Sequence, residues 1–369
     1  MLSEDPGLQA FVERVESARA NGSALCIRGG GTKEFYGEAP YGELLDTRTL
    51  SGISSYEPSE LVVTARCGTP LAELEQALRE QGQCLAFEPP RHGAGGTVGG
   101  MVAAGLAGPS RAAVGSVRDY VLGATLLSGK GEVLSFGGQV IKNVAGYDVS
   151  RLLAGSMGTL GLILEVSLKV LPSTPGNATL SFDLDQATAL ERLNLWGGQP
   201  LPLNASCWLE ENGTGTLYLR LRGAVAAVEA ACNKLGGERM PNAQAAPDWQ
   251  HARDHQLPWF KERKDTQDLW RLSLPQTTPV LDLPNSQLIE WHGGQRWVRA
   301  DAAQGQQLRS MAKNAGGYAT LFIAACARKQ EATGRFDTLK SPLDRIHREL
   351  KREFDPVGVF NPHRMHRDW

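Results

Sequence analysis

The residues of this chain that most suggest a ligand-binding site are glycines, which are concentrated between Gly29 and Gly161. Consecutive glycines let backbone N–H groups converge on one point, because no side chain blocks the approach and φ can be positive. A nest of this kind binds phosphate. The first cluster, 28–33 (RGGGTK), follows an expected strand at 24–27, where a ligand can reach the end of a sheet. Taken alone, it fits a phosphate nest and a plain glycine-rich turn equally well.

Two familiar nucleotide-binding patterns fail here. A Rossmann fingerprint needs GxGxxG at the start of a helix, but Glu34 stands where the third glycine should be. A Walker loop needs GxxxxGK followed by Ser or Thr, but the pair Gly129 and Lys130 is followed by Gly131 in an expected hairpin. Two more glycine-rich segments lie at 89–120 and 155–163. Three such segments in one domain suit a dinucleotide that is held largely by main chain around its pyrophosphate.

The expected secondary structure changes character after Pro172. Before it, hydrophobic patterning predicts helices at 8–20 and from Thr69 (as a helix cap) to Leu78, strands at 61–65 and 162–170, and a hairpin at 123–136. After a linker at 173–176, two rounds of strand, helix and paired strands predict an antiparallel sheet with helices on one face. The strands are expected at 179–184, 206–210, 216–221, 269–274, 287–291, 296–300 and 318–323, and the helices at 186–195, 224–235 and 302–315. Residues 241–258 are expected to be weakly ordered, and 343–354 to form a basic helix.

Three motifs of the first half resemble an FAD-binding domain of the vanillyl-alcohol oxidase / p-cresol methylhydroxylase type. They are IRGGGTK, then GGTVGGMVAAGLAGPSR with GSVRDYVLGA, then VIKNVAGYDVSRLLAGSMGTLGLI, and their order and spacing match over 24–172. The chain is most similar to the smaller FAD-binding subunits of bacterial glycolate oxidase (glycolate dehydrogenase) complexes. The similarity extends to FDPVGVFNP at 354–362.

The resemblance implies an α+β fold with an FAD-binding domain at 1–175, made of subdomains at about 1–56 and 57–175. A smaller α+β cap domain with an antiparallel sheet is expected at 176–335. A C-terminal segment, 336–369, would return to the FAD domain.

The resemblance also assigns cofactor-binding residues. The first loop would grip the pyrophosphate, the second segment would line the middle of the cofactor and its adenosine side, and the third would follow the flavin end, with the backbone of Ile163 near the ring. In chain order these residues are Gly29, Gly30, Gly31, Thr32, Lys33, Thr97, Gly99, Gly100, Ser110, Gly115, Ser116, Thr159, Gly161 and Ile163. Some of these glycines could instead serve only tight packing.

We expect the FAD to be bound without a covalent bond. Many family members tether it through a His after the first loop or a Cys in the second segment. Thr32 stands at the loop position, and no cysteine lies between Cys84 and Cys207. His92 is nearby, but its context does not match a tethering motif.

Oxidation of a 2-hydroxy acid needs a cation for the carboxylate, a base for the hydroxyl proton and the flavin as hydride acceptor. Larger catalytic relatives supply the base with a HxGDGNxH stretch, which this chain lacks, and an acidic residue where Met157 stands. His292, in EWHGGQRW, is a weak catalytic candidate that an ordinary hairpin would also explain. Four arginines could bind a carboxylate or lie in solvent: Arg271, Arg296, Arg299 and Arg328.

The resemblance therefore implies an FAD-carrying subunit of a complex that oxidises glycolate to glyoxylate and passes electrons on. A larger flavin-containing subunit and an iron–sulfur subunit would be its partners, and the larger subunit would do most of the chemistry. One alternative is a self-sufficient FAD-dependent 2-hydroxy-acid dehydrogenase of the D-lactate type. A second is a non-catalytic structural subunit. The tail, 363–369, is either a partner contact or a frayed terminus.

Bulk composition excludes several other classes of protein. The formal net charge is −2, and no long run of Lys or Arg points to nucleic acid or an anionic membrane. The most apolar windows, 98–107 and 160–171, are too short for a membrane span. The six cysteines form no CxxC or His/Cys cluster, so no metal site is indicated. The acidic N-terminus carries no secretory pattern, so we expect a cytoplasmic protein, either free or at the inner face of the membrane within a complex.

Overall fold

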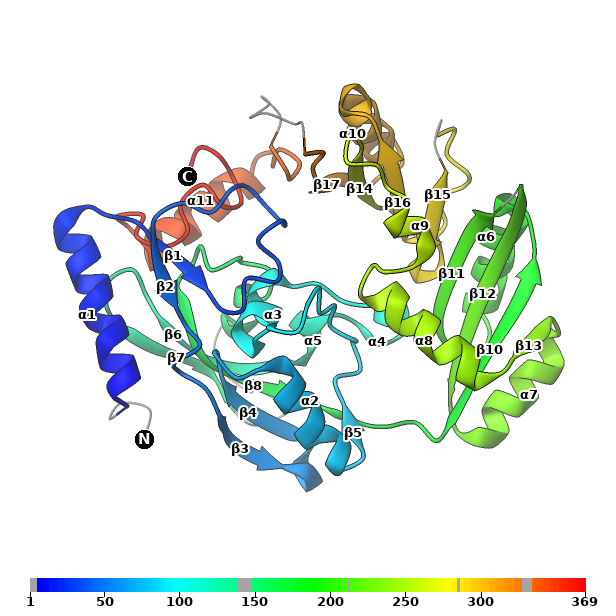
Figure 1. Cartoon of the computed structure of the whole chain (residues 1–369), viewed down its shortest axis with the longest axis horizontal. Coiled ribbons are helices and arrows are strands. Elements are labelled where there is room, and N and C mark those ends of the chain that lie inside the picture. Colours follow the sequence, from blue (N-terminus) through cyan, green and yellow to red (C-terminus); the bar gives the residue numbers. More distant parts are fainter. Residues whose placement is uncertain (1–4, 139–147, 212, 284–285, 327–333) are drawn as a thin grey trace. The chain divides into compact units, whose positions relative to one another are not determined.

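The computed structural model describes residues 5–138, 148–211, 213–283, 286–326 and 334–369, which form two compact units (Figure 1). Unit 1 comprises Met1–Leu106, Ser116–Pro172 and Thr338–Trp369, and unit 2 comprises Ala107–Gly115 and Ser173–Asp337. The short segment Ala107–Gly115 thus groups with unit 2, although we expected it within the FAD-binding domain. Among the described residues, no helix is both long and apolar enough to cross a membrane.

Unit 1 is built on a five-stranded antiparallel sheet in the order β3-β4-β8-β6-β7. Its strands are β3 (Ile53–Glu57), β4 (Val62–Arg66), β6 (Val121–Leu127), β7 (Val133–Gly137) and β8 (Leu162–Lys169). Because β3 pairs with β4, the subdomain boundary expected near residue 56 falls inside this sheet. Two small sheets complete the unit: β1 (Leu25–Arg28) runs parallel to β2 (Glu43–Asp46), and β5 (Gln83–Cys84) pairs with β9 (Leu171–Pro172).

The helices of unit 1 include α1 (Pro6–Asn21), whose start and end follow directly from the sequence. The Asp5 side chain accepts the backbone N–H of Gly7, and Gly22 takes the left-handed conformation that ends the helix. One face buries Leu8, Phe11, Val15 and Ala18. The others are α2 (Leu71–Glu80), α3 (Val98–Ala104), α5 (Val117–Tyr120), α11 (Leu343–Phe354) and the 3-10 turns η2 (Pro58–Glu60) and η3 (Ser150–Leu153).

The cap that we expected for α2 is wrong. Pro70, not Thr69, occupies the N-cap position, and no side chain caps the helix. The Thr69 hydroxyl instead donates to the backbone oxygen of Gly52, 3.0 Å away. A long-range contact therefore takes the group that a local pattern had assigned to the helix.

Unit 2 is built on an eight-stranded sheet in the order β13-β10-β12-β11-β15-β16-β14-β17, with all neighbours antiparallel. Its strands are β10 (Gly176–Asp183), β11 (Leu203–Glu211), β12 (Thr214–Gly223), β13 (Glu238–Met240), β14 (Asp268–Ser273), β15 (Gln287–Glu290), β16 (Gln295–Ala300) and β17 (Tyr318–Ile323). Its helices are α4 (Arg111–Val114), α6 (Gln186–Gly197), α7 (Val225–Leu235), α8 (Asn242–Arg253), α9 (Pro258–Lys261), α10 (Gly305–Asn314) and the 3-10 turns η4 (Trp291–Gly293) and η5 (Ala302–Gln304).

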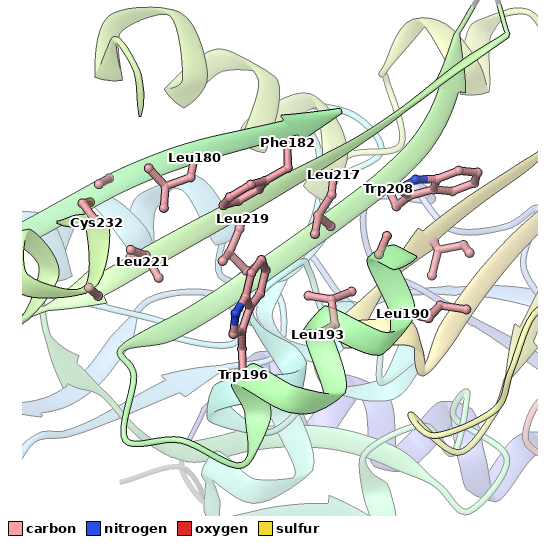
Figure 2. Close-up of a cluster of buried hydrophobic side chains, with 14 of the residues drawn as sticks. Leu180, Phe182, Leu190, Leu193, Trp196, Trp208, Leu217, Leu219, Leu221 and Cys232 are labelled. Carbon is pink, nitrogen blue, oxygen red and sulfur yellow. The ribbon is translucent and has the colours of Figure 1, made fainter. Parts of the chain in front are cut away.

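One face of this sheet carries two apolar cores. In the first, Leu180 and Phe182 of β10 pack with Leu219 of β12, Leu193 and Trp196 of α6 and residues of α7 (Figure 2). In the second, α10 packs on β14, β16 and β17. The core residues of these strands occupy every second position, because side chains at alternate positions share one face of a sheet.

Two of our expectations about unit 2 are wrong. Residues 242–253 form α8, although Pro247 stands inside it, where proline usually ends a helix. The helices also cover both faces of the sheet. The Trp249 indole N–H donates to the Thr179 hydroxyl at 2.9 Å, and Thr179 points to the face opposite its neighbour Leu180.

Candidate cofactor-binding site

A pocket in unit 1 gathers residues from distant parts of the chain at the end of β1. Its walls come from β1 and the loop that follows it, from α3 and its cap, from Met157, and from the C-terminal tail. Of the predicted site residues, the pocket is lined by Gly29, Gly30, Gly31, Thr32, Lys33, Thr97 and Gly100.

The first two glycine-rich segments meet through backbone contacts that leave no room for side chains. A Cβ on Gly30 would lie 1.5 Å from the carbonyl oxygen of Gly95, and one on Gly29 would lie 2.3 Å from Thr97 Oγ1. Gly31 has a φ of +70°, which glycine adopts readily. These glycines therefore join two segments of the pocket wall as well as shaping the loop.

Thr97 fixes the start of α3 at the edge of the pocket. Its side chain accepts the backbone N–H of Gly100 at 3.2 Å, so the helix begins at a defined point beside the loop. Gly99 serves packing, because a Cβ there would lie 2.6 Å from Cys67 Cβ. It is not among the residues that line the pocket.

In the third segment Met157 lines the pocket, whereas the three predicted residues are buried in the unit around it. The Thr159 hydroxyl donates to the backbone oxygen of Ser156. Gly161, with a φ of +148°, packs against Leu127, and Ile163 lies within β8. Their contact with FAD stays a prediction.

The last three predicted residues lie near the boundary of the two units in the sequence. Ser110, which is buried, and Gly115 belong to the segment grouped with unit 2. Ser116 belongs to unit 1 and forms a capping box with Asp119 at the start of α5. Their proximity to a cofactor also stays a prediction.

The C-terminal tail supplies two pocket residues that sequence reasoning missed, Asn361 and Arg364. The Asn361 side-chain oxygen accepts the backbone N–H of Ile27 at 2.8 Å. Its amide donates to the backbone oxygen of Met157 at 2.7 Å. Asn361 thus ties the first and third segments of the pocket together. The signal that could have found it was the FNP motif of the tail.

A buried ion pair holds the tail in place. Lys351 Nζ pairs with Asp355 and donates to the backbone oxygens of Thr159 at 2.7 Å and Phe360 at 2.9 Å. Asp355 also accepts the backbone N–H groups of Val359 and Phe360, each at 2.8 Å. Each charge is therefore met by several partners, as burial requires.

The charged groups of the pocket suit an anion. Arg28 pairs with Glu34 at 2.7 Å, and Lys33 and Arg364 add two more cations to the wall. Cys26 also lines the pocket, and burial raises the pKa of its thiol, so it stays protonated at neutral pH. A glycine-shaped cradle with excess positive charge fits the pyrophosphate of FAD.

The weak catalytic candidate His292 lies in η4, the turn between β15 and β16, with a φ of +55°. Its backbone N–H donates to the Ser206 hydroxyl at 2.9 Å. Burial lowers the pKa of the imidazole to about 4, and its buried Nδ1 has no hydrogen-bond partner among the described residues. The ring is therefore neutral at pH 7, and its role in catalysis stays a prediction.

A second titratable group, Glu290, lies at the end of β15 and was missed by sequence reasoning. It is 2% exposed, and its carboxylate accepts the indole N–H of Trp297 at 2.7 Å and the side-chain amide of Gln295 at 3.0 Å. Burial raises the pKa of this carboxyl to about 7. Glutamate at a strand end is ordinary in sequence, so no local signal marked it.

The four candidate carboxylate-binding arginines have different surroundings. Arg296 is fully buried and donates to backbone oxygens at 278–279, and burial lowers its pKa to about 10. Arg299 lies over an indole ring and donates to a backbone oxygen of α9. Arg271 lies over a phenyl ring, and Arg328 falls outside the described residues. In the part of the chain that the structure describes, no cluster of His, Cys, Asp and Glu could hold a metal ion.

Comparison with known proteins gives the chain a family. A family model described as "FAD binding domain" matches residues 8–137. "Glycolate oxidase subunit GlcE" of Escherichia coli strain K12 is 44% identical over 366 residues, which cover 99% of either chain. This chain belongs to the GlcE family of glycolate oxidase subunits. The expected family and FAD as the cofactor are thereby confirmed.

More distant relatives share parts of the chain. A D-lactate dehydrogenase of Anaerostipes hadrus is 35% identical over 132 residues, which cover 36% of this chain and 27% of that protein. A solved structure of alkyldihydroxyacetonephosphate synthase matches with a TM-score of 0.64 at 15% identity, over 95% of this chain and 75% of that one. That likeness concerns the fold alone and supports the expected α+β class with its FAD-binding domain. The match with GlcE and the FAD-binding family model show that this chain is an FAD-dependent oxidoreductase.

Proposed function

We propose that this chain is the FAD-carrying subunit of a glycolate oxidase complex, which oxidises glycolate to glyoxylate. The observation that supports it most is the match with GlcE over 99% of either chain. The glycine-rich backbone segments of the cationic pocket agree with it. A larger flavin-containing subunit and an iron–sulfur subunit would complete the assembly. A peripheral association with the inner face of the membrane would then occur through the complex.

The loop Gly29–Gly31 with Thr32 and Lys33 would hold the pyrophosphate through backbone N–H groups and the lysine ammonium. Thr97 and Gly100 would lie along the cofactor, and Asn361 would keep the wall segments in register. The bound FAD supplies a two-electron acceptor for the hydride of a 2-hydroxy acid. A threonine at the loop position and a protonated Cys26 thiol support a cofactor without a covalent bond.

The residues of unit 2 support oxidation mainly on the partner subunit. Arg296 already uses its guanidinium on backbone oxygens, and His292 is a weak base with a pKa of about 4. A base with so low a pKa takes a hydroxyl proton poorly at neutral pH. This chain would then bind FAD and relay electrons within the complex.

A self-sufficient 2-hydroxy-acid dehydrogenase is the second candidate. The similarity to D-lactate dehydrogenases and the buried, unpartnered Nδ1 of His292 among the described residues favour it. It would require His292 and an arginine to face the substrate.

Purification of the chain alone and with co-expressed partner subunits tests both candidates. We expect flavin absorption in each sample, flavin released to the supernatant on acid precipitation, and glycolate-dependent dye reduction only in the complex. Bleaching of the flavin by glycolate or D-lactate in the isolated chain would favour the second candidate. Two results together would contradict both candidates: an isolated chain without flavin, and a complex that holds no more flavin than its larger subunit.

A further inference from the structure

Arg364 lines the pocket from the far end of the sequence and is held through both its side chain and its backbone. Its guanidinium donates to the backbone oxygen of Glu34 at 3.0 Å. Its own backbone oxygen accepts the N–H of Glu38 at 3.0 Å. The residue therefore lies against the segment that follows the glycine loop, in the wall of the pocket.

The anchoring of the tail gives this guanidinium a fixed position. Asn361, three residues earlier, bonds to Ile27 and Met157 on two other sides of the pocket. The Lys351–Asp355 pair fixes the chain before it. A cation held in this way is already oriented for a ligand, so little side-chain freedom is lost on binding.

The balance of charge in the pocket indicates which part of FAD would meet this residue. The charged residues in its wall are Arg28, Lys33 and Arg364 against one carboxylate, Glu34, which pairs with Arg28. The excess is two positive charges. A diphosphate carries about one negative charge on each phosphate at neutral pH. The planar fork of an arginine also matches phosphate oxygens better than a point charge does.

We propose that Arg364 is a cofactor-binding residue that contacts the diphosphate of FAD opposite the glycine loop. The inference rests on the proposed function, because it requires that this pocket hold FAD. It makes the C-terminal tail part of the binding site, in addition to its packing role. The alternative that must be separated from it is a purely structural one, in which Arg364 only holds the backbone of Glu34.

Arg364→Gln and Arg364→Lys separate these two roles. Glutamine carries an amide donor but loses the charge, whereas lysine keeps the charge. Arg367→Ala is a matched control, because Arg367 lies on the same tail, pairs with Glu38 at 3.3 Å and is not among the lining residues. The dissociation constant of FAD is measured on apoprotein by flavin fluorescence at two salt concentrations, beside the thermal midpoint of each apoprotein.

We expect Arg364→Gln to raise the FAD dissociation constant roughly tenfold, as for the loss of one charge-assisted contact to phosphate. Its salt dependence should become weaker than in the wild type. Arg364→Lys should stay within about threefold of wild type and Arg367→Ala within about twofold. The flavin absorption maxima should not change, because the contact is with the diphosphate. The apoprotein midpoint of Arg364→Lys should equal that of the wild type.

Three results would overturn the assignment. They are wild-type affinity in Arg364→Gln, a shifted flavin spectrum in that variant, and a loss of apoprotein stability that Arg364→Lys does not restore. In each case the wild-type protein still binds FAD. A wild-type chain without FAD would instead remove the proposed function itself, so the two failures are distinguishable.

Discussion

Buried charge is handled differently in the two units. In unit 1, Lys351 and Asp355 neutralise each other. Lys351 donates to backbone oxygens of the third glycine-rich segment and the tail, and Asp355 accepts backbone N–H groups of the tail. In unit 2, Glu290 and Arg296 are each bound by neutral groups, an indole and an amide for the acid and backbone oxygens for the arginine. The first arrangement fixes the wall of the candidate cofactor pocket. The second arrangement makes the free energy of unfolding depend on whether the Glu290 carboxyl is protonated near neutral pH.

The largest effect is expected when the ion pair of unit 1 is broken. Asp355→Ala leaves the buried Lys351 ammonium without its counter-charge and removes the acceptor of two backbone N–H groups. We expect a loss of about 3–5 kcal/mol in the free energy of unfolding, measured by denaturant titration. Glu353→Ala is the control, because Glu353 pairs with Lys130 at the surface and should cost less than about 1 kcal/mol. Equal effects of the two variants would refute the comparison.

Glu290→Gln tests the carboxyl of unit 2. Its folded pKa of about 7 lies above the ordinary 4.5, so the wild type loses stability as pH rises from about 4.5 through about 7. Glutamine removes this loss and keeps an oxygen for Trp297 and Gln295. As pH rises from 4.5 to 8, we expect the free energy of unfolding of the variant to increase by about 3 kcal/mol relative to that of the wild type. A difference in thermal midpoint that is the same at both pH values would contradict the assignment.

Gly30→Ala and Gly95→Ala test how far unit 1 depends on backbone contact. A Cβ on Gly30 would meet the Gly95 oxygen at 1.5 Å, whereas one on Gly95 would lie 3.6 Å from Gly30, an ordinary contact. We expect Gly30→Ala to destabilise the protein by about 1–3 kcal/mol and to weaken FAD binding. Gly95→Ala should leave both nearly unchanged. The free energy of unfolding and the FAD dissociation constant measure the asymmetry, and equal losses in the two variants would show that this contact has no special role.

His292→Gln tests the buried imidazole of unit 2, whose effect on stability should appear at acidic pH. The folded pKa of about 4 lies below the ordinary 6.5, so the wild type gains stability as pH rises from about 4 through about 6.5. This trend opposes that of Glu290, two residues away in the sequence. At pH 5 the variant should be more stable than the wild type by about 1–2 kcal/mol, with no difference above pH 7. Thermal unfolding across this pH range checks it, and a difference that persists at pH 8 would point to packing instead.

The parts of the fold that local sequence patterns determine were predictable. The basic helix at 343–354 and the hairpin around Gly129 follow from periodicity and turn chemistry, and both occur as expected. Helix α8 was missed, because Pro247 interrupts the pattern of Ala245, Trp249 and Ala252 that packs on the sheet. In that case tertiary packing outweighed a local preference.

The residues of the candidate site also differ in whether a local sequence pattern marks them. The glycines around Gly30 are visible in the sequence, because their spacing reflects a backbone requirement. Arg364 has no local signal, because its surroundings come from segments far away in the chain. Glu290 contacts residues only five and seven positions away, but a glutamate at the end of a strand is ordinary in sequence. Arg364 meets Glu34 across 330 positions of sequence, a relation that no motif of a few residues encodes.

The two hydrogen bonds of Asn361 set an order of events during protein synthesis. Its partners, Ile27 and Met157, leave the ribosome early, and all of Ser173–Asp337 must be translated before residue 361 follows. From Met157 to Asn361 the nascent chain grows by 204 residues, so it carries an incomplete candidate site for more than half of its translation. We expect FAD to bind only after the chain leaves the ribosome. Bound flavin would then mark completed chains, and chains stalled on the ribosome would carry none.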